Sequence, residues 1–265
     1  MSGPFGQTLP IGAPLPGSSF TDLLHSVGAA PRWEVSDSAA TSLSVPEGTT
    51  VLALRFADGV VMAGDRRATE GHLVAHRYIQ KVFAADGHSA VAIAGTAGIA
   101  VEMVRLFQVE LEHYEKIEGT VLSLEGKANF LARLVRNQLP MAFQGLVVVP
   151  LFAGYDLHER RGRLFTYDVV GGRYEEHDFG ATGSGSRLAK SYLRTVFRPD
   201  LTADEAVGQA VSALVAAADD DTATGGPDLI RGILPNVMVI DGEGVREADE
   251  EAVAGTARTA LEARR

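Results

Sequence analysis

The stretch that decides the interpretation of this chain is EGTTVLAL, residues 47–54. A glycine and two threonines stand directly before an apolar run that has the length of a strand. A threonine hydroxyl is a poor nucleophile unless a base lies beside it, and the free amine of a threonine at a chain terminus is such a base. The same residues are also typical of an ordinary turn that leads into a strand. The rest of the chain must decide between these two interpretations.

Residues 1–48 differ in composition from everything that follows them. They contain six of the eleven prolines, the only tryptophan and many small residues. Such a segment buries too little apolar surface to offset the entropy lost when a chain becomes ordered. We therefore expect a flexible, removable leader with one short helix near residues 19–25.

The overall composition narrows the class of protein. Of the 265 residues, 46% are hydrophobic, which is enough for a substantial core. The net charge of −10 opposes contact with nucleic acids and anionic lipids. Without cysteine the chain has no disulfides and no thiolate metal sites. There is neither a run of about 20 apolar residues nor a secretion signal, so we expect a cytoplasmic protein without a membrane or nucleic-acid partner.

From Thr49 onward the pattern predicts strands, helices, strands, helices and a final strand. Asp-Gly turns at residues 58–59 and 86–87 indicate two hairpins. Segregated runs of this kind favour an α+β layered fold, with two sheets face to face and helices outside, over an alternating parallel sheet. The expected strands are 49–56, 60–65, 81–85, 89–94, 146–155, 164–170 and 236–240, with a charged loop at 158–163. The expected helices are one ending at Gly119, one starting after Ser123 and kinked at Pro140, then 187–196, 203–218 and 249–265.

Three features downstream of Thr49 are candidates to complete a site. Asp65 closes the second strand, Lys81 opens the third, and DTATGG (221–226) follows a helix. Taken singly, each is ordinary, because acids are common in turns and lysines at strand ends. The acidic run at 219–221 is unusual, since negative charges at a helix C-terminus oppose the helix dipole and require a stabilising partner.

Together these segments resemble proteasome β subunits of the bacterial type found in actinobacteria. The resemblance runs from about residue 47 to residue 240. It implies the four-layer αββα sandwich of N-terminal nucleophile hydrolases and a threonine endopeptidase. It also implies that residues 1–48 are a propeptide removed by autocleavage after Gly48, and that residues 49–265 form the peptidase domain. The segments that carry it are GTT (48–50), GDRRAT (64–69), KV (81–82), AGTA (94–97), GSGS (183–186) and DTATGG (221–226).

By this resemblance Thr49 is the nucleophile, with Asp65 and Lys81 beside it. An α-amine has a pKa of about 7.7–8.0 and a lysine about 10.4, so the Thr49 amine is the better base at neutral pH. Lys81, held charged by Asp65, would favour the Thr49 alkoxide. While Gly48 is attached, the Thr49 nitrogen is an amide and the precursor is inactive. The other positions implied are Ser184, Asp221 and Thr224 around the amine, with Thr224 where family members often have serine, and the Gly95 amide as oxyanion donor.

The resemblance further implies a substrate pocket and a set of partners. None of the pocket residues is charged, so we expect chymotrypsin-like cleavage after bulky apolar residues. The expected partners are other copies of this chain in heptameric rings, proteasome α subunit rings, an ATPase activator ring and protein substrates; no cofactor or metal is expected. The pocket positions are Ala68, Ile79, Phe83, Ile93 and Ala97, with Thr69 and Ala97 binding substrate through their backbones as an added strand.

Rival interpretations have weaker support. His72 and His76 have the spacing of a zinc-protease helix but lack its glutamate. GSG at 183–185 lacks the third glycine of a dinucleotide loop, where Leu188 stands instead. A simpler bacterial threonine peptidase that pairs with an unfoldase ring differs after Gly-Asp and lacks so long a leader. A structural ring subunit on the same fold would lack the terminal threonine and its lysine.

Overall fold

Strand β1 (Thr50–Phe56) is an inner strand of a five-stranded antiparallel sheet with the order β10-β1-β2-β11-β12. The predicted hairpin is confirmed, since β1 pairs with β2 (Gly59–Gly64) from Val51–Gly64 to Phe56–Gly59. The other strands of this sheet are β10 (Phe179–Gly183), β11 (Asn236–Asp241) and β12 (Gly244–Glu247). The structure, a computed structural model, describes residues 48–70 and 73–264, so the expected leader and its short helix lie outside the described residues.

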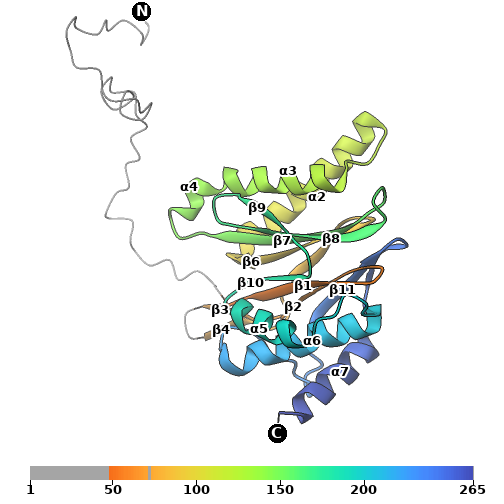
Figure 1. Cartoon of the computed structure of the whole chain (residues 1–265). Helices are drawn as coiled ribbons and strands as arrows, with labels where there is room; N and C mark the ends of the chain where they lie inside the picture. Colours follow the sequence, from red (N-terminus) through yellow and green to blue (C-terminus); the bar gives the residue numbers. More distant parts are fainter. Residues whose placement is uncertain (1–47, 71–72, 265) are drawn as a thin grey trace, which may run out of the picture. The chain divides into compact units, whose positions relative to one another are not determined.

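A second five-stranded antiparallel sheet lies against the first, with its strands in sequence order from β5 to β9 (Figure 1). Its first hairpin, β5–β6, is also the predicted one. A two-stranded ribbon, β3–β4, connects the two sheets along the chain. The strands are β3 (Ala68–Glu70), β4 (Leu73–His76), β5 (Val82–Asp86), β6 (Ser89–Gly95), β7 (Val148–Asp156), β8 (Arg161–Tyr167) and β9 (Arg173–Glu176).

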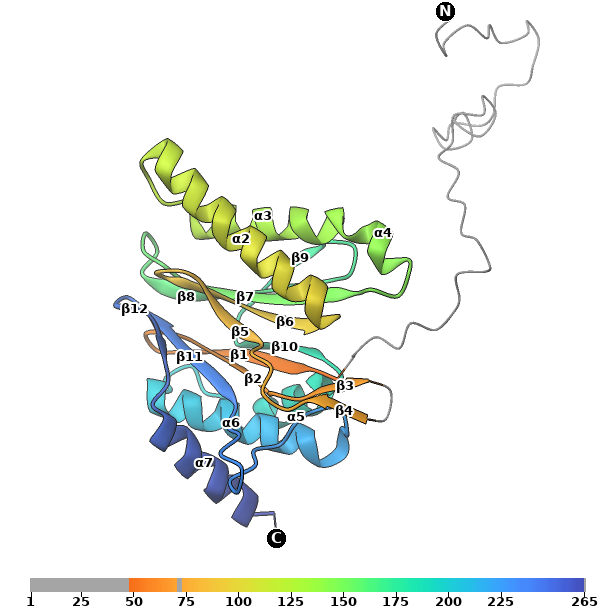
Figure 2. The same ribbon diagram turned by 180° about the vertical axis from the view of Figure 1, so that it is seen from behind.

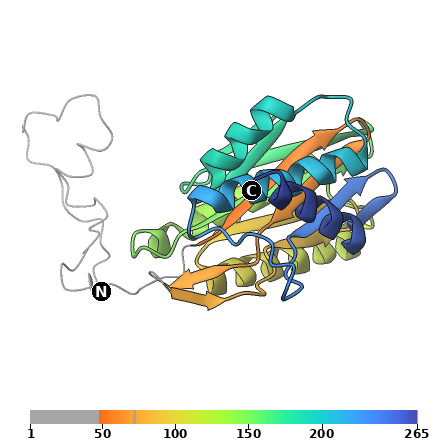
Figure 3. The ribbon, with the colours of Figure 1, turned by 90° about the horizontal axis from the view of Figure 1, so that it is seen from below.

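Helices cover the outer faces of both sheets. Figure 2 shows α2 (Ala97–Glu118) and α3 (Leu124–Asn137), followed by the short α4 (Leu139–Ala142), on the sheet that contains β7. Seen from below, α5 (Ser186–Val196), α6 (Ala203–Asp220) and α7 (Glu250–Glu262) lie across the sheet that contains β1 (Figure 3). The four layers confirm the expected αββα sandwich.

The side chains of β1 alternate between two cores. Leu52 and Leu54 pack against the helices, whereas Val51 and Ala53 pack against the second sheet. All four are fully buried. Because both faces of the strand are covered, the sequence is apolar at every position from 51 to 54, without the alternation of a half-exposed strand.

Local signals place most helix ends as expected. Gly119 ends α2 in the left-handed conformation, with φ of 68°. The Ser123 side chain caps α3 by accepting a hydrogen bond from the Gly126 amide at 3.1 Å. Pro140 lies in α4, a separate short helix, so the expected kink is instead a break after Asn137. The proline has no amide hydrogen with which to continue α3.

The boundaries of β8 differ from the prediction. The strand begins at Arg161, inside the expected charged loop, and ends before the expected Val170. Arg163 is buried in the strand because it forms ion pairs with Glu175 of β9 at 2.6 Å and Glu125 of α3 at 2.8 Å. The charged residues of this segment therefore predicted a loop, but their acidic partners on β9 and α3 allow it to form a strand. The short strands β3, β4, β9, β10 and β12 were also not predicted.

A buried ion pair attaches the β5–β6 hairpin to α3. Lys127 Nζ lies 2.5 Å from Asp86 Oδ2, and the lysine is 4% exposed. Burial raises the pKa of Asp86, but the charge of Lys127 and hydrogen bonds from Lys127, His88 and Ser89 outweigh this effect and leave the pKa below its ordinary value. The pair therefore stabilises the folded state when Asp86 is ionised.

Replacement of Lys127 by methionine leaves Asp86 without its counter-charge. We expect K127M to lower the free energy of unfolding by about 3 kcal/mol at pH 7. The pKa of Asp86 is lower in the folded state than in the unfolded state. The ion pair therefore stabilises the fold fully above the unfolded-state pKa, and this stabilisation is lost as the pH falls through the folded-state pKa. The difference in free energy of unfolding between wild type and K127M should thus narrow below about pH 4.

Urea unfolding of the isolated subunit, followed by circular dichroism at several pH values, measures this gap. K116M is the matched control, because it breaks the exposed Lys116–Glu112 pair on α2 and is expected to cause no measurable change. Equal stability of K127M and wild type at pH 7 would contradict the role given to the buried pair.

Candidate active site

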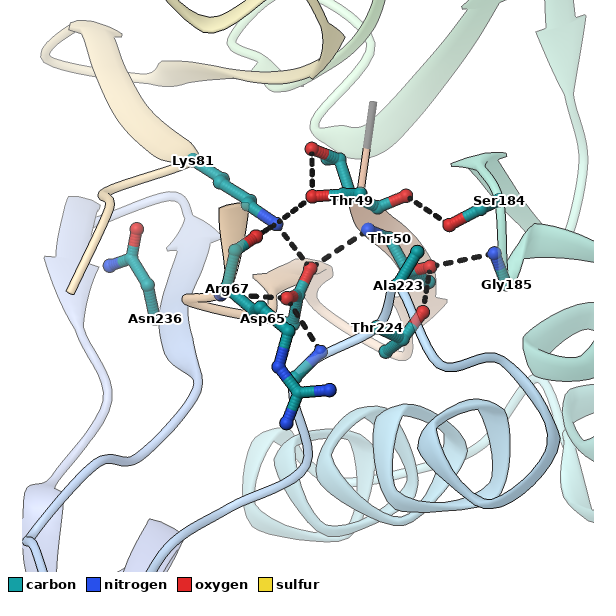
Figure 4. Close-up of polar contacts among 12 residues, drawn as sticks. Thr49, Thr50, Asp65, Arg67, Lys81, Ser184, Gly185, Ala223, Thr224 and Asn236 are labelled. Carbon is teal, nitrogen blue, oxygen red and sulfur yellow. Dashed lines mark hydrogen bonds and ion pairs between the residues drawn. The ribbon is translucent and has the colours of Figure 1, made fainter. Parts of the chain in front are cut away.

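Thr49 lies at the entrance to β1 and is only 6% exposed. Its carbonyl oxygen accepts a hydrogen bond from the Ser184 amide at 2.9 Å and lies 3.3 Å from Ser184 Oγ. Its Oγ1 donates to the carbonyl oxygen of Gly48 at 2.8 Å (Figure 4). A Cβ on Gly48 would overlap Thr69 Oγ1 and lie 2.8 Å from the Ala223 carbonyl oxygen. Only glycine therefore fits beside the Thr49 hydroxyl in this conformation.

Asp65 and Lys81 meet beside Thr49, although they flank strands of different sheets. Asp65 directly follows β2 and Lys81 directly precedes β5. Lys81 Nζ lies 2.6 Å from Asp65 Oδ1, and both side chains are buried. Nζ also donates to the carbonyl oxygens of Arg67 at 2.5 Å and Gly48 at 3.2 Å. All three ammonium hydrogens thus have acceptors, and one of them is the carbonyl of Gly48.

The Asp65 carboxylate accepts four hydrogen bonds. Oδ1 accepts from Lys81 Nζ and from the Thr50 amide at 2.8 Å. Oδ2 accepts from the amides of Arg67 at 2.9 Å and Gly225 at 2.8 Å. A carboxylate has about four acceptor positions, so this one is saturated. It joins β1, the segment after β2 and the loop after α6 at one point.

Burial lowers the pKa of Lys81. Removal of the ammonium from water destabilises its charged form more than the charge and hydrogen bond of Asp65 stabilise it. The nearby Arg67 charge acts in the same direction. We expected Asp65 to hold Lys81 charged, and the ion pair is present, but the net direction of the pKa is downward. A lysine of lowered pKa gives up a proton more readily than an exposed one.

Ser184, Asp221 and Thr224 form one cluster. Asp221 Oδ2 accepts from Ser184 Oγ at 2.6 Å and from Thr224 Oγ1 at 2.5 Å, and its Oδ1 accepts from the Ala223 amide at 3.1 Å. Of the three clustered residues, only Ser184 hydrogen-bonds Thr49 within the described part of the chain, and it does so through its backbone amide at the Thr49 carbonyl oxygen. Thr224 instead reaches Thr50, with the two Oγ1 atoms 2.5 Å apart.

Two of the three aspartates in the acidic run at the end of α6 have partners. Asp221 is held by the hydroxyls and amide described above. Asp219 forms an ion pair with Arg264, which follows α7. Val253 and Ala257 of α7 are buried against the core that includes α6. The residues just after the C-terminal helix therefore supply a cation that offsets part of the unfavourable charge at this helix end.

Gly95 ends β6 with φ of 112°, a conformation that favours glycine. A Cβ there would overlap the carbonyl oxygen of Val147, which directly precedes β7. The close approach of this segment therefore requires glycine at position 95. Gly95 and Thr49 line the same pocket, and α2 begins two residues after Gly95. The positive end of the α2 dipole thus lies next to this pocket.

The pocket beside Thr49 contains most of the predicted lining but not all of it. Phe83 is absent from the lining and packs instead against the core under α2. Thr69, which was predicted to bind substrate through its backbone and not to line the pocket, lies against Gly48. Val101 and Ala100 were not predicted, although helical spacing from Ala97 places both on its face of α2. The lining residues are Thr49, Ala68, Ile79, Lys81, Ile93, Gly95, Ala97, Ala100 and Val101.

Two further residues of the site were missed. Thr50 is fully buried, and both its amide and its hydroxyl make hydrogen bonds within the site. Arg67 supplies a carbonyl to Lys81, and its Nη1 donates to the Thr222 carbonyl oxygen at 2.9 Å. The only sequence signal for Thr50 was its place beside Thr49, where a β-branched strand residue is unremarkable.

No group of three or more potential metal ligands lies close together in residues 48–70 and 73–264. His76 is exposed on β4, and His72 lies outside the described residues. Within those same ranges no helix is long and apolar enough to cross a bilayer.

Sequence comparison finds close relatives. A family model described as "Proteasome subunit" matches residues 45–230. A protein named "Proteasome subunit beta" from Acidothermus cellulolyticus is 58% identical over 224 residues, 83% of this chain and 77% of the relative. Proteins of the same name from Acidimicrobium ferrooxidans and Jonesia denitrificans are 58% identical over 235 residues and 54% identical over 247 residues. These cover 89% and 92% of this chain, and 86% and 82% of the relatives.

Removal of the Asp65 charge tests the centre of the site. In D65N the carboxylate is replaced by an amide that cannot accept all four donors, and Lys81 loses its counter-charge. We expect the free energy of unfolding to fall by about 3 kcal/mol, and the Gly225 and Arg67 amides to exchange faster with deuterium.

Urea unfolding and hydrogen exchange of the isolated subunit measure these effects. D58N, in the exposed turn between β1 and β2, is the control and is expected to change neither quantity. Unchanged protection of the Gly225 amide in D65N would show that the carboxylate does not hold this loop.

Proposed function

The chain belongs to the proteasome subunit family, and we propose that it is a catalytic β subunit that acts as a threonine endopeptidase. In this proposal the chain is cut after Gly48, and Thr49 then provides both the nucleophilic hydroxyl and the basic amine. The relatives' shared name, "Proteasome subunit beta", supports the type of subunit.

One observation carries the proposal: two donors converge on the carbonyl of the bond to be cut. Thr49 Oγ1 and Lys81 Nζ lie 2.8 and 3.2 Å from the Gly48 carbonyl oxygen. The hydroxyl is thus next to the carbonyl that it must attack, and the ammonium faces the oxygen on which negative charge develops. Burial of the ion pair strengthens this electrostatic interaction.

Removal of the leader follows from this arrangement. Thr49 Oγ1 attacks the Gly48 carbonyl carbon and gives its proton to solvent, while Lys81 stabilises the oxyanion. The bond between the Gly48 carbon and the Thr49 nitrogen then breaks, and the nitrogen takes up a proton. The resulting ester of Gly48 on Thr49 Oγ1 is hydrolysed by water, which releases the leader as a carboxylate and leaves Thr49 with a free amine.

The same groups act on a substrate once the leader has left. The substrate carbonyl takes the place of the Gly48 carbonyl, and the Thr49 amine accepts the proton of Oγ1. The amine has an ordinary pKa of about 7.7–8.0, so a useful fraction is unprotonated near neutral pH. We assign oxyanion stabilisation to the Gly95 amide, supported by its place in the Thr49 pocket beside the positive end of α2.

Membership of the family implies assembly into a proteasome core with other subunits. We propose heptameric rings of this chain between rings of α subunits, with an ATPase ring that delivers unfolded proteins. The leader keeps the site inactive until it is cleaved off, because the Thr49 amine does not exist before cleavage.

The side-chain pocket is lined by apolar groups, which supports cleavage after apolar residues. The space it leaves for water-sized groups is small, about 20 Å³. A large side chain therefore enters only if some of the lining side chains move. Lys81 is the one charged residue in the lining, and its ammonium is already bound to Asp65 and to two carbonyls.

Thr49→Ala tests the nucleophile. The variant has no hydroxyl to attack Gly48, so we expect it to retain residues 1–48 and to show no peptidase activity after assembly with α subunits. Intact-mass spectrometry measures the leader, and a fluorogenic peptide measures activity. T49S keeps the hydroxyl and is the control, in which the leader should be removed. A processed T49A subunit would refute autocleavage by this residue.

A fluorogenic peptide panel tests the pocket. We expect cleavage after Leu, Phe and Tyr to exceed cleavage after Arg or Asp by at least about tenfold in kcat/KM. In V101A the pocket is larger, and kcat/KM for Phe should rise by up to about tenfold relative to that for Ala. V109A, on the exposed face of α2, is the control and should leave this ratio unchanged. Preference for Arg or Asp would show that the pocket is wrongly assigned.

A further inference from the structure

The second threonine of the GTT motif has a buried side chain with a complete set of partners. Thr50 is 0% exposed. Its Oγ1 accepts a hydrogen bond from the Gly185 amide at 2.9 Å and lies 2.5 Å from Thr224 Oγ1. Figure 4 shows these groups on the side of Thr49 away from Lys81. The mechanism proposed above does not use this hydroxyl.

The Asp221 carboxylate, at the end of this series of hydrogen bonds, fixes which atom donates in each bond. The Asp221 carboxylate can only accept, so the hydrogen between it and Thr224 belongs to Thr224 Oγ1. That hydroxyl has no second hydrogen, so the hydrogen between the two threonines comes from Thr50. The chain of donors therefore runs from the Gly185 amide through Thr50 and Thr224 to Asp221 Oδ2.

This series of hydrogen bonds connects three segments that are far apart in the sequence. Thr50 belongs to β1, Gly185 to the turn before α5, and Thr224 to the loop after α6. A Cβ on Gly185 would lie 2.6 Å from both threonine hydroxyls, so glycine lets the backbone approach them. Asp221 Oδ2 also accepts from the Ser184 hydroxyl, and the backbone amide of Ser184 donates to the Thr49 carbonyl oxygen at 2.9 Å. The hydroxyl of Thr50 thus helps to hold the loop after α6, which contains Thr224 and Asp221, in its position near Thr49.

We propose that Thr50 is a positioning residue whose hydroxyl orients Thr224 and, through it, the Asp221 carboxylate and Ser184 beside Thr49. The inference rests on the proposed function and extends it. The two adjacent threonines have separate tasks: Thr49 reacts, and Thr50 orders the groups on the far side of the reacting residue. Without the Thr50 hydroxyl, the Gly185 amide and Thr224 Oγ1 lose a buried partner, and the Asp221 loop loses its connection to β1.

The chemistry predicts a specific kinetic signature. Thr50 does not line the substrate pocket, so its hydroxyl should affect the chemical step and not substrate binding. In T50V, which keeps the shape of the side chain but not the hydroxyl, we expect kcat to fall between about 10- and 100-fold with KM changed less than about twofold. T50S restores the hydroxyl and should recover kcat to within about threefold of wild type.

The experiment uses full-length subunits assembled with α rings. Steady-state kinetics on an apolar fluorogenic peptide give kcat and KM, and intact mass gives the fraction of processed subunits, to which kcat is normalised. T182V is the matched control on the neighbouring strand β10. Its hydroxyl has no hydrogen bond to any described residue, and kcat should not change. T224V breaks the same chain at its other member and should match T50V, and the double variant T50V/T224V should be within about twofold of the worse single variant.

The outcomes separate this inference from the function on which it rests. If T49A still cleaves peptides, the proposed function fails. If T49A is inactive but T50V has the kcat of wild type, or T50S is as impaired as T50V, the positioning role fails and Thr50 is only a packing residue. If T50V does not assemble, T224V and T224S decide in its place. A low kcat in T224V that is recovered in T224S supports the series of hydrogen bonds. A kcat in T224V equal to that of wild type overturns it.

Discussion

The buried Asp65 carboxylate is the point on which the site depends. A charge removed from water is costly unless every acceptor position is used. Here the lysine ammonium and three backbone amides satisfy it, and they come from β1, from the segment after β2, from the residue before β5 and from the loop after α6. None of these segments can move alone without leaving part of the charge unpaired. The carboxylate therefore converts separate pieces of chain into one rigid site.

The sandwich makes this meeting possible. Asp65 flanks a strand of one sheet and Lys81 a strand of the other, and the core between the sheets is formed largely by alanine and valine side chains such as Val51, Ala53 and Ala92. Facing sheets pack about 10 Å apart, a gap that a lysine and an aspartate side chain can span when they reach toward each other. The larger side chains, among them Leu52 and Leu54, point away to the helix layers. The division of small and large residues between the two faces of β1 thus sets the distance between the two halves of the ion pair.

The same geometry relates the precursor to the proposed enzyme. Gly48 lies where a larger residue would collide with Thr69 and Ala223, and its carbonyl receives both Thr49 Oγ1 and Lys81 Nζ. The bond at the start of β1 is thus presented to the site much as a substrate bond would be. On the other side of Thr49, the hydroxyls of Thr224 and Ser184 converge on Asp221, and Thr50 joins them through Thr224. Two hydrogen-bonded groups, one centred on each aspartate, hold the reacting residue between them.

The sequence alone determined the order of the main strands and helices, because turn residues, caps and apolar periodicity act over a few neighbouring residues. It also indicated Thr49, Asp65, Lys81, Ser184, Asp221 and Thr224 as a set, since their surrounding motifs have a recognisable order. The tertiary structure decided that β8 begins within the charged segment, because Arg163 finds acidic partners from β9 and α3. It also decided that Thr224 contacts Thr50, that Phe83 stays out of the pocket and that Val101 enters it. Such contacts join residues distant in the chain, and their geometry depends on how whole layers pack, which no local pattern encodes.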